Sequence, residues 1–222
     1  MKKGFTLNLD SIPYKVLVSM PQQHERRASA QRQFADLGME VEWKIPVKIE
    51  DIDWEILPEI YQVRPKYASQ TLTLIETFEE AKRRGASHFA HFEDDVIFHL
   101  EVLSLLPQID VPEDWKFIYL GGRNWGPKKY VSQGLVRPHY VYDLHAVIIR
   151  TDMIDLLKQI LLDPTVKSYW ADSRIALLHK RYPTYLCRPN LAWQSVHPDD
   201  SGGGLNYSNY LEDGSIRAGQ GD

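Results

Sequence analysis

The sequence has little cysteine and no long hydrophobic run. Cys187 is the one cysteine among 222 residues, so no disulfide can form within the chain. No apolar stretch approaches the length of a membrane span or of the hydrophobic part of a signal peptide. These two absences favour a reducing, cytoplasmic setting and predict that the chain has no integral membrane segment.

A large excess of charge of one sign is also absent. The formal net charge is -4 and the pI is near 6.1, so the overall charge does not indicate a nucleic-acid or membrane surface. Hydrophobic residues make up 43% of the chain, which is enough to bury a substantial core. We interpret residues 1–201 as one domain and predict that the glycine-rich residues 202–222 form a mobile tail.

The N-terminal part of the chain alternates between strand and helix patterns. Tyr14 to Met20 predicts a strand, and Gln22 to Leu37 predicts a helix that Gly38 closes. Val41 to Val47 predicts a second strand. A β-α-β unit of this kind occurs in mostly parallel sheets with helices on their faces. We therefore predict an α/β fold with a mostly parallel central sheet flanked by helices.

Later segments extend this pattern. Ser69 is placed to cap a helix that ends at Gly85 and leads into a strand over His88 to Phe92. The segment Arg123 to Arg137 is rich in basic and aromatic residues and predicts a mobile, anion-binding flap. The other predictions are an irregular connection over Glu50 to Pro65, strands over Phe117 to Leu120 and Tyr140 to Ile149, a helix capped by Thr151, and a helix over Ala171 to Lys180.

Three consecutive carboxylates follow the strand that ends at Phe92. Glu93, Asp94 and Asp95 stand where the apolar run stops. Such a run of negative charge is costly beside a buried strand unless water, a basic group or a divalent metal compensates it, and hard oxygen ligands suit Mg²⁺ or Mn²⁺. Open α/β sheets bind ligands beyond the carboxyl ends of their strands. The triplet therefore predicts a cation site, and a solvated surface loop is the alternative interpretation.

The order of several short motifs resembles that of a known family. The motifs are Arg26-Arg27 in the first helix, Ser69 before the acidic triplet, Glu93-Asp94-Asp95-Val96, Tyr119-Leu120-Gly121-Gly122, His145-Ala146-Val147-Ile148-Ile149, Asp172, and Pro189 to Gln194 before a Ser/Asp tail. In this order the chain resembles glycosyltransferase family 25, the lipopolysaccharide and collagen-type sugar transferases. The resemblance implies a GT-A fold that uses a nucleotide-diphosphate sugar, most often of uridine, and a divalent metal. The chain departs from the family at Ser69-Gln70, where Ser-His is common.

The resemblance assigns the acidic triplet to the metal and the nucleotide. Asp95 would supply a carboxylate to the metal, while Glu93 or Asp94 would accept hydrogen bonds from the ribose hydroxyls. His197 matches a metal-binding histidine near the C-terminus, and an ordinary surface histidine is its alternative interpretation. A metal has a chemical purpose in sugar transfer, because the departing nucleoside diphosphate gains negative charge that a cation stabilises.

Four further residues complete the donor-binding set. Arg26 and Arg27 would contact the donor phosphates, although a solvated pair on a helix surface explains the same two residues. Ser69 and Gln194 belong to the motifs of the resemblance and are assigned with them to the nucleotide sugar.

An acceptor hydroxyl that attacks a sugar must lose its proton, usually to a carboxylate within hydrogen-bond reach. Asp172 is the first candidate for this base, because a predicted helix N-terminus follows it and the resemblance places an acidic residue used in acceptor activation near this point. Asp143, which stands within a predicted apolar strand, is the second candidate. A structural cap is the alternative interpretation of Asp172.

We therefore predict a metal-dependent glycosyltransferase that moves a sugar from a UDP-sugar to a hydroxyl acceptor, with Mn²⁺ or Mg²⁺ as cofactor. A saccharide is the first candidate acceptor. A hydroxylated DNA base is the second, because the basic segment Arg123 to Arg137 suits phosphate contacts. The alternatives from other classes are a metal-dependent nucleotide-sugar hydrolase and a non-catalytic nucleotide-sugar-binding domain.

Overall fold

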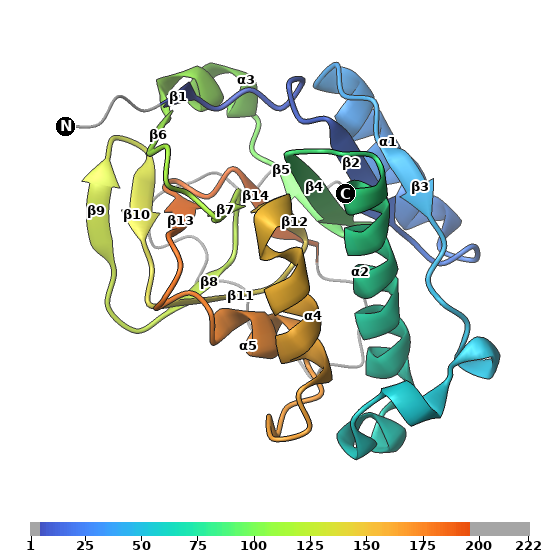
Figure 1. Cartoon of the computed structure of the whole chain (residues 1–222). Coiled ribbons are helices and arrows are strands. Elements are labelled where there is room, and N and C mark those ends of the chain that lie inside the picture. Colours follow the sequence, from blue (N-terminus) through green and yellow to red (C-terminus); the bar gives the residue numbers. More distant parts are fainter. Residues whose placement is uncertain (1–4, 196–222) are drawn as a thin grey trace.

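A central sheet of eight strands organises the computed structural model, which describes residues 5–195 (Figure 1). Its strands lie in the order β3 (Glu42–Lys44), β2 (Tyr14–Val18), β4 (His88–Glu93), β12 (Ala146–Arg150), β7 (Phe117–Tyr119), β13 (Thr184–Cys187), β10 (Leu135–Arg137) and β9 (Lys129–Ser132). Smaller pairings join β1 (Phe5–Thr6) to β6 (Asp110–Val111), β8 (Arg123–Trp125) to β11 (Tyr140–Tyr142), and β5 (Val96–Phe98) to β14 (Ala192–Gln194). The helices are α1 (His24–Asp36), α2 (Pro65–Arg83), α3 (Val102–Leu105), α4 (Ile154–Leu162) and α5 (Ala171–Ala176).

The sheet is mixed, whereas the sequence predicted a mostly parallel one. Strand β2 runs parallel to β3 and β4, and β7 runs parallel to β13, but β12 lies antiparallel between β4 and β7. No helix occurs between β7 and β12 in the described chain. Strand β12 enters the sheet at the edge where β7 ends, since Val147 pairs with Tyr119, the last residue of β7, and it runs in the opposite direction.

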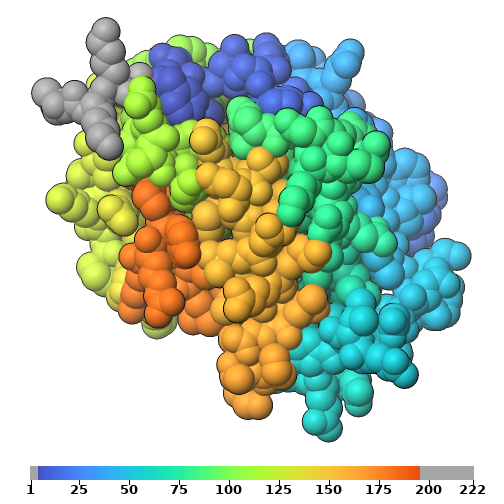
Figure 2. Space-filling model, viewed as in Figure 1, coloured from blue at the N-terminus to red at the C-terminus, as the bar shows by residue number. Residues whose placement is uncertain are grey.

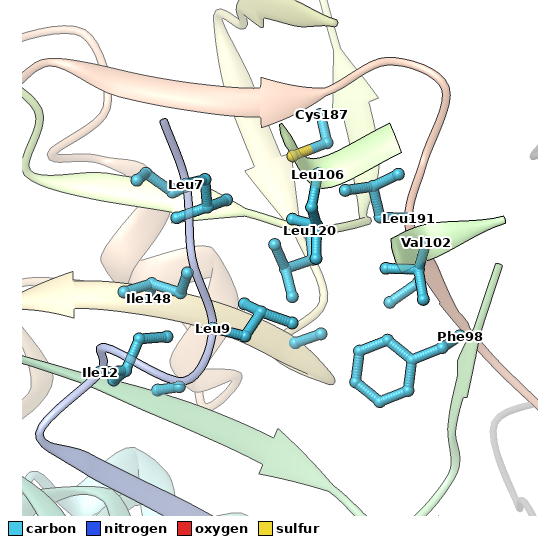
Figure 3. Packing of buried hydrophobic residues seen from close by; sticks show 14 of the residues in the cluster. Leu7, Leu9, Ile12, Phe98, Val102, Leu106, Leu120, Ile148, Cys187 and Leu191 are labelled. Atoms are coloured by element: carbon cyan, nitrogen blue, oxygen red, sulfur yellow. The ribbon is translucent and has the colours of Figure 1, made fainter. Parts of the chain in front are cut away.

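Helices cover both faces of the sheet, which confirms the predicted α/β class. On one face α1 buries Ala30 and Phe34 against Phe92 of β4. The same cluster continues through β5, α3 and the buried Cys187 of β13 (Figure 3). On the other face α2 and α4 lie side by side, and both pack on the sheet (Figures 1 and 2). The central sheet therefore lies between these two helical layers.

The predicted β-α-β unit at the N-terminus is confirmed. Gly38 ends α1 with a positive φ of 68°, and Gly85 follows α2 with a φ of 66°. Glycine has no Cβ to clash in this left-handed conformation, so both residues act as the predicted helix terminators. None of the helices in residues 5–195 is both long and apolar enough to cross a membrane.

Several predicted elements differ in the structure. The strand predicted over Tyr140 to Ile149 is two strands, β11 and β12, which belong to different sheets and separate at Asp143. The flap predicted over Arg123 to Arg137 contains strands β8, β9 and β10. Helix α5 is shorter than predicted and ends at Ala176.

Neither predicted cap acts as one. Helix α2 starts at Pro65, so Ser69 lies inside it and donates its hydroxyl proton to the carbonyl of Val47, 2.5 Å away. Thr151 precedes α4 in a short 3-10 turn and donates to the carbonyls of Ala86 and Ser87.

Candidate carboxylate site at the sheet edge

Four carboxylates meet where the parallel strands end. Val18 of β2 pairs with Glu93, the last residue of β4, and Ala146 opens β12 beside Phe92. The segment that leads into β12 carries Asp143 to the same edge. The four are Glu93, Asp95, Asp143 and Asp172; Gln194 contacts the first two, and Asp172 accepts the backbone N–H of Asp143. The negative charges of Asp95, Asp143 and Asp172 all raise the pKa of the Glu93 carboxyl.

An arginine of α1 holds the second and third members of the triplet. The Arg26 guanidinium lies 2.8 Å from an Asp94 oxygen and 3.1 Å from an Asp95 oxygen. Both carboxylates are 8% exposed, and a buried charge is tolerated only with a compensating partner. The structure thus places Arg26 at the predicted site and directs it to the carboxylates.

Two glutamine amides tie the triplet together. The Gln70 amide of α2 donates to Glu93 at 3.0 Å. The Gln194 amide of β14 lies 3.4 Å from Glu93 and 3.3 Å from Asp95, so one NH₂ group bridges the two carboxylates. The backbone N–H of Ser195 also donates to the Asp95 carbonyl at 2.7 Å. These contacts bring Gln194 into the same cluster as Glu93 and Asp95.

Glycine lets β14 approach the site. A Cβ on Gly121 would lie 1.6 Å from the carbonyl oxygen of Ala192, the first residue of β14. The carbonyl of Leu120 accepts the backbone N–H of Leu191 at 2.6 Å. Gly121 is therefore required for the close approach that carries Gln194 to the carboxylates.

Burial and neighbouring charge change the acidity of Glu93. Loss of hydration is the largest cause, followed by the charge of Asp95, and together they raise the pKa of Glu93 from 4.5 to about 8. The hydrogen bond from Gln70 acts in the opposite direction. Glu93 and Asp95 therefore resist simultaneous ionisation unless positive charge enters between them.

Asp143 sits at a strained turn held by an arginine. It has a φ of 77°, which is uncommon for a residue other than glycine. The Arg123 guanidinium contacts its carboxylate at 2.7 Å through Nη2 and at 3.0 and 3.1 Å through Nε. A fork of this kind is the strong geometry for an arginine and a carboxylate, and it orients Asp143. The interpretation of Asp143 as part of an apolar strand was wrong, because the residue lies between two strands.

The backbone of Asp143 is tied to the other predicted base. An Asp172 oxygen accepts the Asp143 N–H at 3.1 Å, and the other Asp172 oxygen accepts the Ser173 N–H at 2.5 Å. Burial raises the pKa of Asp172, which these hydrogen bonds partly oppose. A carboxylate with a raised pKa is a stronger base than an exposed one, so the burial of Asp172 suits it to proton removal.

A buried arginine fixes the segment that precedes Asp172. Arg174 is 0% exposed, and its guanidinium donates to five backbone carbonyls between the end of α4 and the start of α5. These are the carbonyls of Ile160, Leu161, Asp163, Val166 and Ser168. Arg174 thereby gives the α4–α5 connection one conformation and sets the position of Asp172.

Three of the predicted site residues lie elsewhere or beyond the described chain. The hydroxyl of Ser69 is engaged by Val47, as described above. Arg27 contacts the carbonyls of Met20 and Pro21 and stacks 4.0 Å over the Trp43 ring. His197 falls outside residues 5–195.

The donor set suits a divalent cation that a ligand helps to bind. In residues 5–195 no group of three or more His, Cys, Asp or Glu side chains is arranged to enclose a metal ion. Mg²⁺ and its relatives, however, often bind through one or two carboxylates and the phosphates of a substrate. Glu93 and Asp95, which share the Gln194 amide, would supply the two carboxylates for such a site.

Two residues of the site escaped sequence reasoning. Gln70 entered only as a departure from a family pattern, yet its amide contacts Glu93. Arg123 was assigned to a flap, yet it orients Asp143. Glutamine and arginine are residue types that donate hydrogen bonds, and a buried carboxylate needs such a donor. The sequence does not show, however, which donor lies near which carboxylate.

Comparisons with known proteins find solved structures with a similar fold and no similar sequence. No known protein family and no curated protein matches the sequence. A glycosyltransferase involved in the glycosylation of the major capsid of PBCV-1 is 8% identical over 78% of this chain and 81% of that chain, with a TM-score of 0.46. A Drosophila galactosyltransferase 7 mutant in complex with manganese, UDP-Gal and xylobiose is 11% identical over 93% and 76%, with a TM-score of 0.46. At this level of similarity neither structure carries a functional argument for this chain.

Proposed function

We propose that this protein transfers a sugar from a nucleotide-diphosphate sugar, with UDP as the first candidate nucleotide, to a hydroxyl acceptor with the help of Mn²⁺ or Mg²⁺. The observation that carries the proposal is the pair Glu93 and Asp95, two carboxylates bridged by Gln194 at the carboxyl edge of the sheet. This pair sits near Asp143 and Asp172, whose negative charges raise the pKa of Glu93, and Asp172 accepts the backbone N–H of Asp143. A cation site next to a buried base can supply both charge stabilisation for a departing nucleoside diphosphate and proton removal from an acceptor hydroxyl.

Asp95, with Glu93, would hold the divalent cation. When bound, that ion stabilises the negative charge that develops on the departing nucleoside diphosphate. Gln194 keeps the two carboxylates together, and Arg26 offsets the charge of Asp94. His197 stays a candidate additional ligand from outside the described residues.

Asp172 is the proposed base that takes the proton from the acceptor hydroxyl. Its burial raises its pKa, and Ser173 and the backbone of Asp143 fix its direction. Asp143 is held by Arg123 and serves as a positioning residue for Asp172. The first candidate acceptor is a saccharide and the second is a hydroxylated DNA base.

The proposal is tested in two stages. A thermal-shift screen of nucleotide sugars, each with Mn²⁺ and with EDTA, identifies the donor, since a ligand at about a hundredfold its Kd stabilises a protein by about 2.7 kcal/mol. The protein is then incubated with that donor and a panel of saccharide acceptors, and both the transferred sugar and the free sugar are quantified.

Asp95→Asn and Asp110→Asn form a matched pair of variants, because Asp110 is an exposed aspartate outside the site. We expect transfer by the wild-type protein and by Asp110→Asn, and loss of transfer in Asp95→Asn. Release of free sugar at an equal rate with and without acceptor would instead identify a hydrolase. Donor binding that is indifferent to Mn²⁺ would favour a binding domain and contradict the proposal.

A further inference from the structure

A basic pocket lies apart from the carboxylate site. Its volume is about 360 Å³, which is within the range of small-ligand sites. None of the four candidate carboxylates lines it. Its charged and titratable lining residues are Lys128, Lys129, Arg137, His139, His179 and Lys180. The lining therefore contains four cationic side chains and no acidic one.

These cations are not compensated within residues 5–195. Lys128, Lys129, Arg137 and Lys180 form no ion pair with any residue of that part of the chain. Lys180 lies 4.7 Å from the centre of the Tyr140 ring. The protein as a whole has a net charge of -4, so the cluster does not reflect a generally basic surface. Like charges gathered around one hollow repel one another, and a bound anion removes that repulsion.

A neutral histidine forms a fixed wall of the pocket. His179 is 1% exposed, and its Nδ1 accepts the backbone N–H of Val141 at 3.1 Å. Nε2 therefore carries the ring proton and donates to the Tyr119 hydroxyl at 3.1 Å. Burial lowers the pKa of His179 to about 3, so the ring stays uncharged. His179 thus ties the pocket to strand β7 of the central sheet.

The two-stranded ribbon of β8 and β11 connects the pocket to the carboxylate site. At one end Tyr142 pairs with Arg123, the partner of Asp143. Just beyond the other end His139, which lines the pocket, precedes β11. Asp143 stands four positions after His139, which corresponds to no more than about 14 Å of extended chain. A ligand about that long that lies along the ribbon would span from His139 to Asp143.

We propose that the basic pocket binds a phosphate group carried by the acceptor, while the acceptor's hydroxyl lies at Asp172. This inference depends on the proposed function and narrows its acceptor to a phosphorylated hydroxyl compound. Lysine ammonium groups and an arginine fork favour a phosphate, which offers more negative charge and more acceptor oxygens than a carboxylate does. The exposed Trp125 on the ribbon, with 70% of its surface accessible, offers a ring face to the body of such an acceptor.

Titration with inorganic pyrophosphate in EDTA tests the pocket directly. Without a metal the carboxylate site repels this anion, so binding reports on the pocket. The test variant is Lys128→Gln with Lys129→Gln, and the control variant is Lys66→Gln with Lys167→Gln, which removes two exposed charges outside the pocket. Citrate, titrated at the same ionic strength, separates recognition of phosphate from attraction of any polyanion.

We expect wild-type and control proteins to bind pyrophosphate equally, more tightly than citrate and less tightly at high salt. The test variant should bind at least about tenfold more weakly, since each lysine supplies a charge-assisted hydrogen bond. The inference would be overturned if the wild-type protein did not bind pyrophosphate, or if it bound citrate as tightly as pyrophosphate. It would also be overturned if the test variant bound pyrophosphate as tightly as wild type, or if the control variant lost as much affinity as the test variant.

A parallel titration with UDP and Mn²⁺ separates this inference from the proposed function. We expect UDP affinity to be unchanged in the Lys128→Gln, Lys129→Gln variant. If the wild-type protein binds pyrophosphate but does not bind UDP in the presence of Mn²⁺, the proposed function is contradicted. The pocket then binds phosphate for a purpose other than sugar transfer. If the protein binds UDP in the presence of Mn²⁺ but does not bind pyrophosphate, only the inference that the basic pocket binds phosphate is contradicted.

Discussion

Replacing Glu93 with glutamine should change how the stability of the protein depends on pH. Glu93 is held between the amides of Gln70 and Gln194 and beside the charge of Asp95. Burial and that charge raise its pKa from 4.5 to about 8 in the folded protein. Glutamine has the same shape but carries no titratable proton, so Glu93→Gln removes this one contribution.

The sign and the size follow from proton binding. Between pH 4.5 and about 8 the folded protein keeps the proton of Glu93, whereas the unfolded chain has lost it. The folded state therefore binds more protons, and the contribution of Glu93 to the free energy of unfolding decreases as pH rises through this window. The decrease is at most about 1.4 kcal/mol per pH unit for one proton. Above about pH 8 the folded protein also loses the proton and the decrease stops.

Urea unfolding in EDTA at several pH values measures this effect. The difference in unfolding free energy between Glu93→Gln and wild type should grow in favour of the variant from about pH 5 to about pH 7.5. The control is Glu101→Gln, which replaces an exposed glutamate and should run parallel to wild type. Mn²⁺ should reduce the slope of the wild-type protein, since a cation at Glu93 and Asp95 favours the ionised form. Parallel curves for Glu93→Gln and wild type would refute the account of Glu93.

Other substitutions test the base and the scaffold of the site. Asp172→Asn should lower the rate of transfer by roughly a hundredfold to ten-thousandfold while UDP affinity stays within about twofold of wild type, and full turnover in this variant would exclude Asp172 as the base. Arg174→Leu should lower the free energy of unfolding by more than about 3 kcal/mol in urea titrations, because five backbone carbonyls lose the donor of a buried guanidinium, and a loss below about 1 kcal/mol would contradict that role. Gly121→Ala should lower both the Tm and the affinity for UDP with Mn²⁺, because a Cβ there collides with Ala192 and displaces β14, and a variant with wild-type Tm would show that β14 can move without cost.

Local patterns allowed much of the fold to be predicted. The apolar run of β2, the helix of α1 and the glycines at positions 38 and 85 each carry a signal within a few residues, and all of them hold in the structure. The acidic triplet was likewise visible, because three consecutive carboxylates directly follow an apolar strand and charge beside a buried strand needs a compensating partner.

Features that depend on distant contacts escaped the sequence. The chain breaks between β11 and β12 at Asp143, whose positive φ is maintained by contacts with Arg123 and Asp172. Within the predicted flap, β10 pairs with β13, about fifty residues later along the chain, and β8 pairs with β11. Arg174 looks like any surface arginine in the sequence, and its burial depends on the path of the α4–α5 connection.

The central claim is that Glu93 and Asp95 bind a cation together with a nucleoside diphosphate. Isothermal titration of UDP into wild-type and Asp95→Asn protein, each with Mn²⁺ and with EDTA, tests this claim most directly. We predict that wild-type protein binds UDP at least about tenfold more tightly with Mn²⁺, and that Asp95→Asn loses this gain. Equal UDP affinity with and without the ion, or an unchanged Mn²⁺ effect in Asp95→Asn, would contradict it.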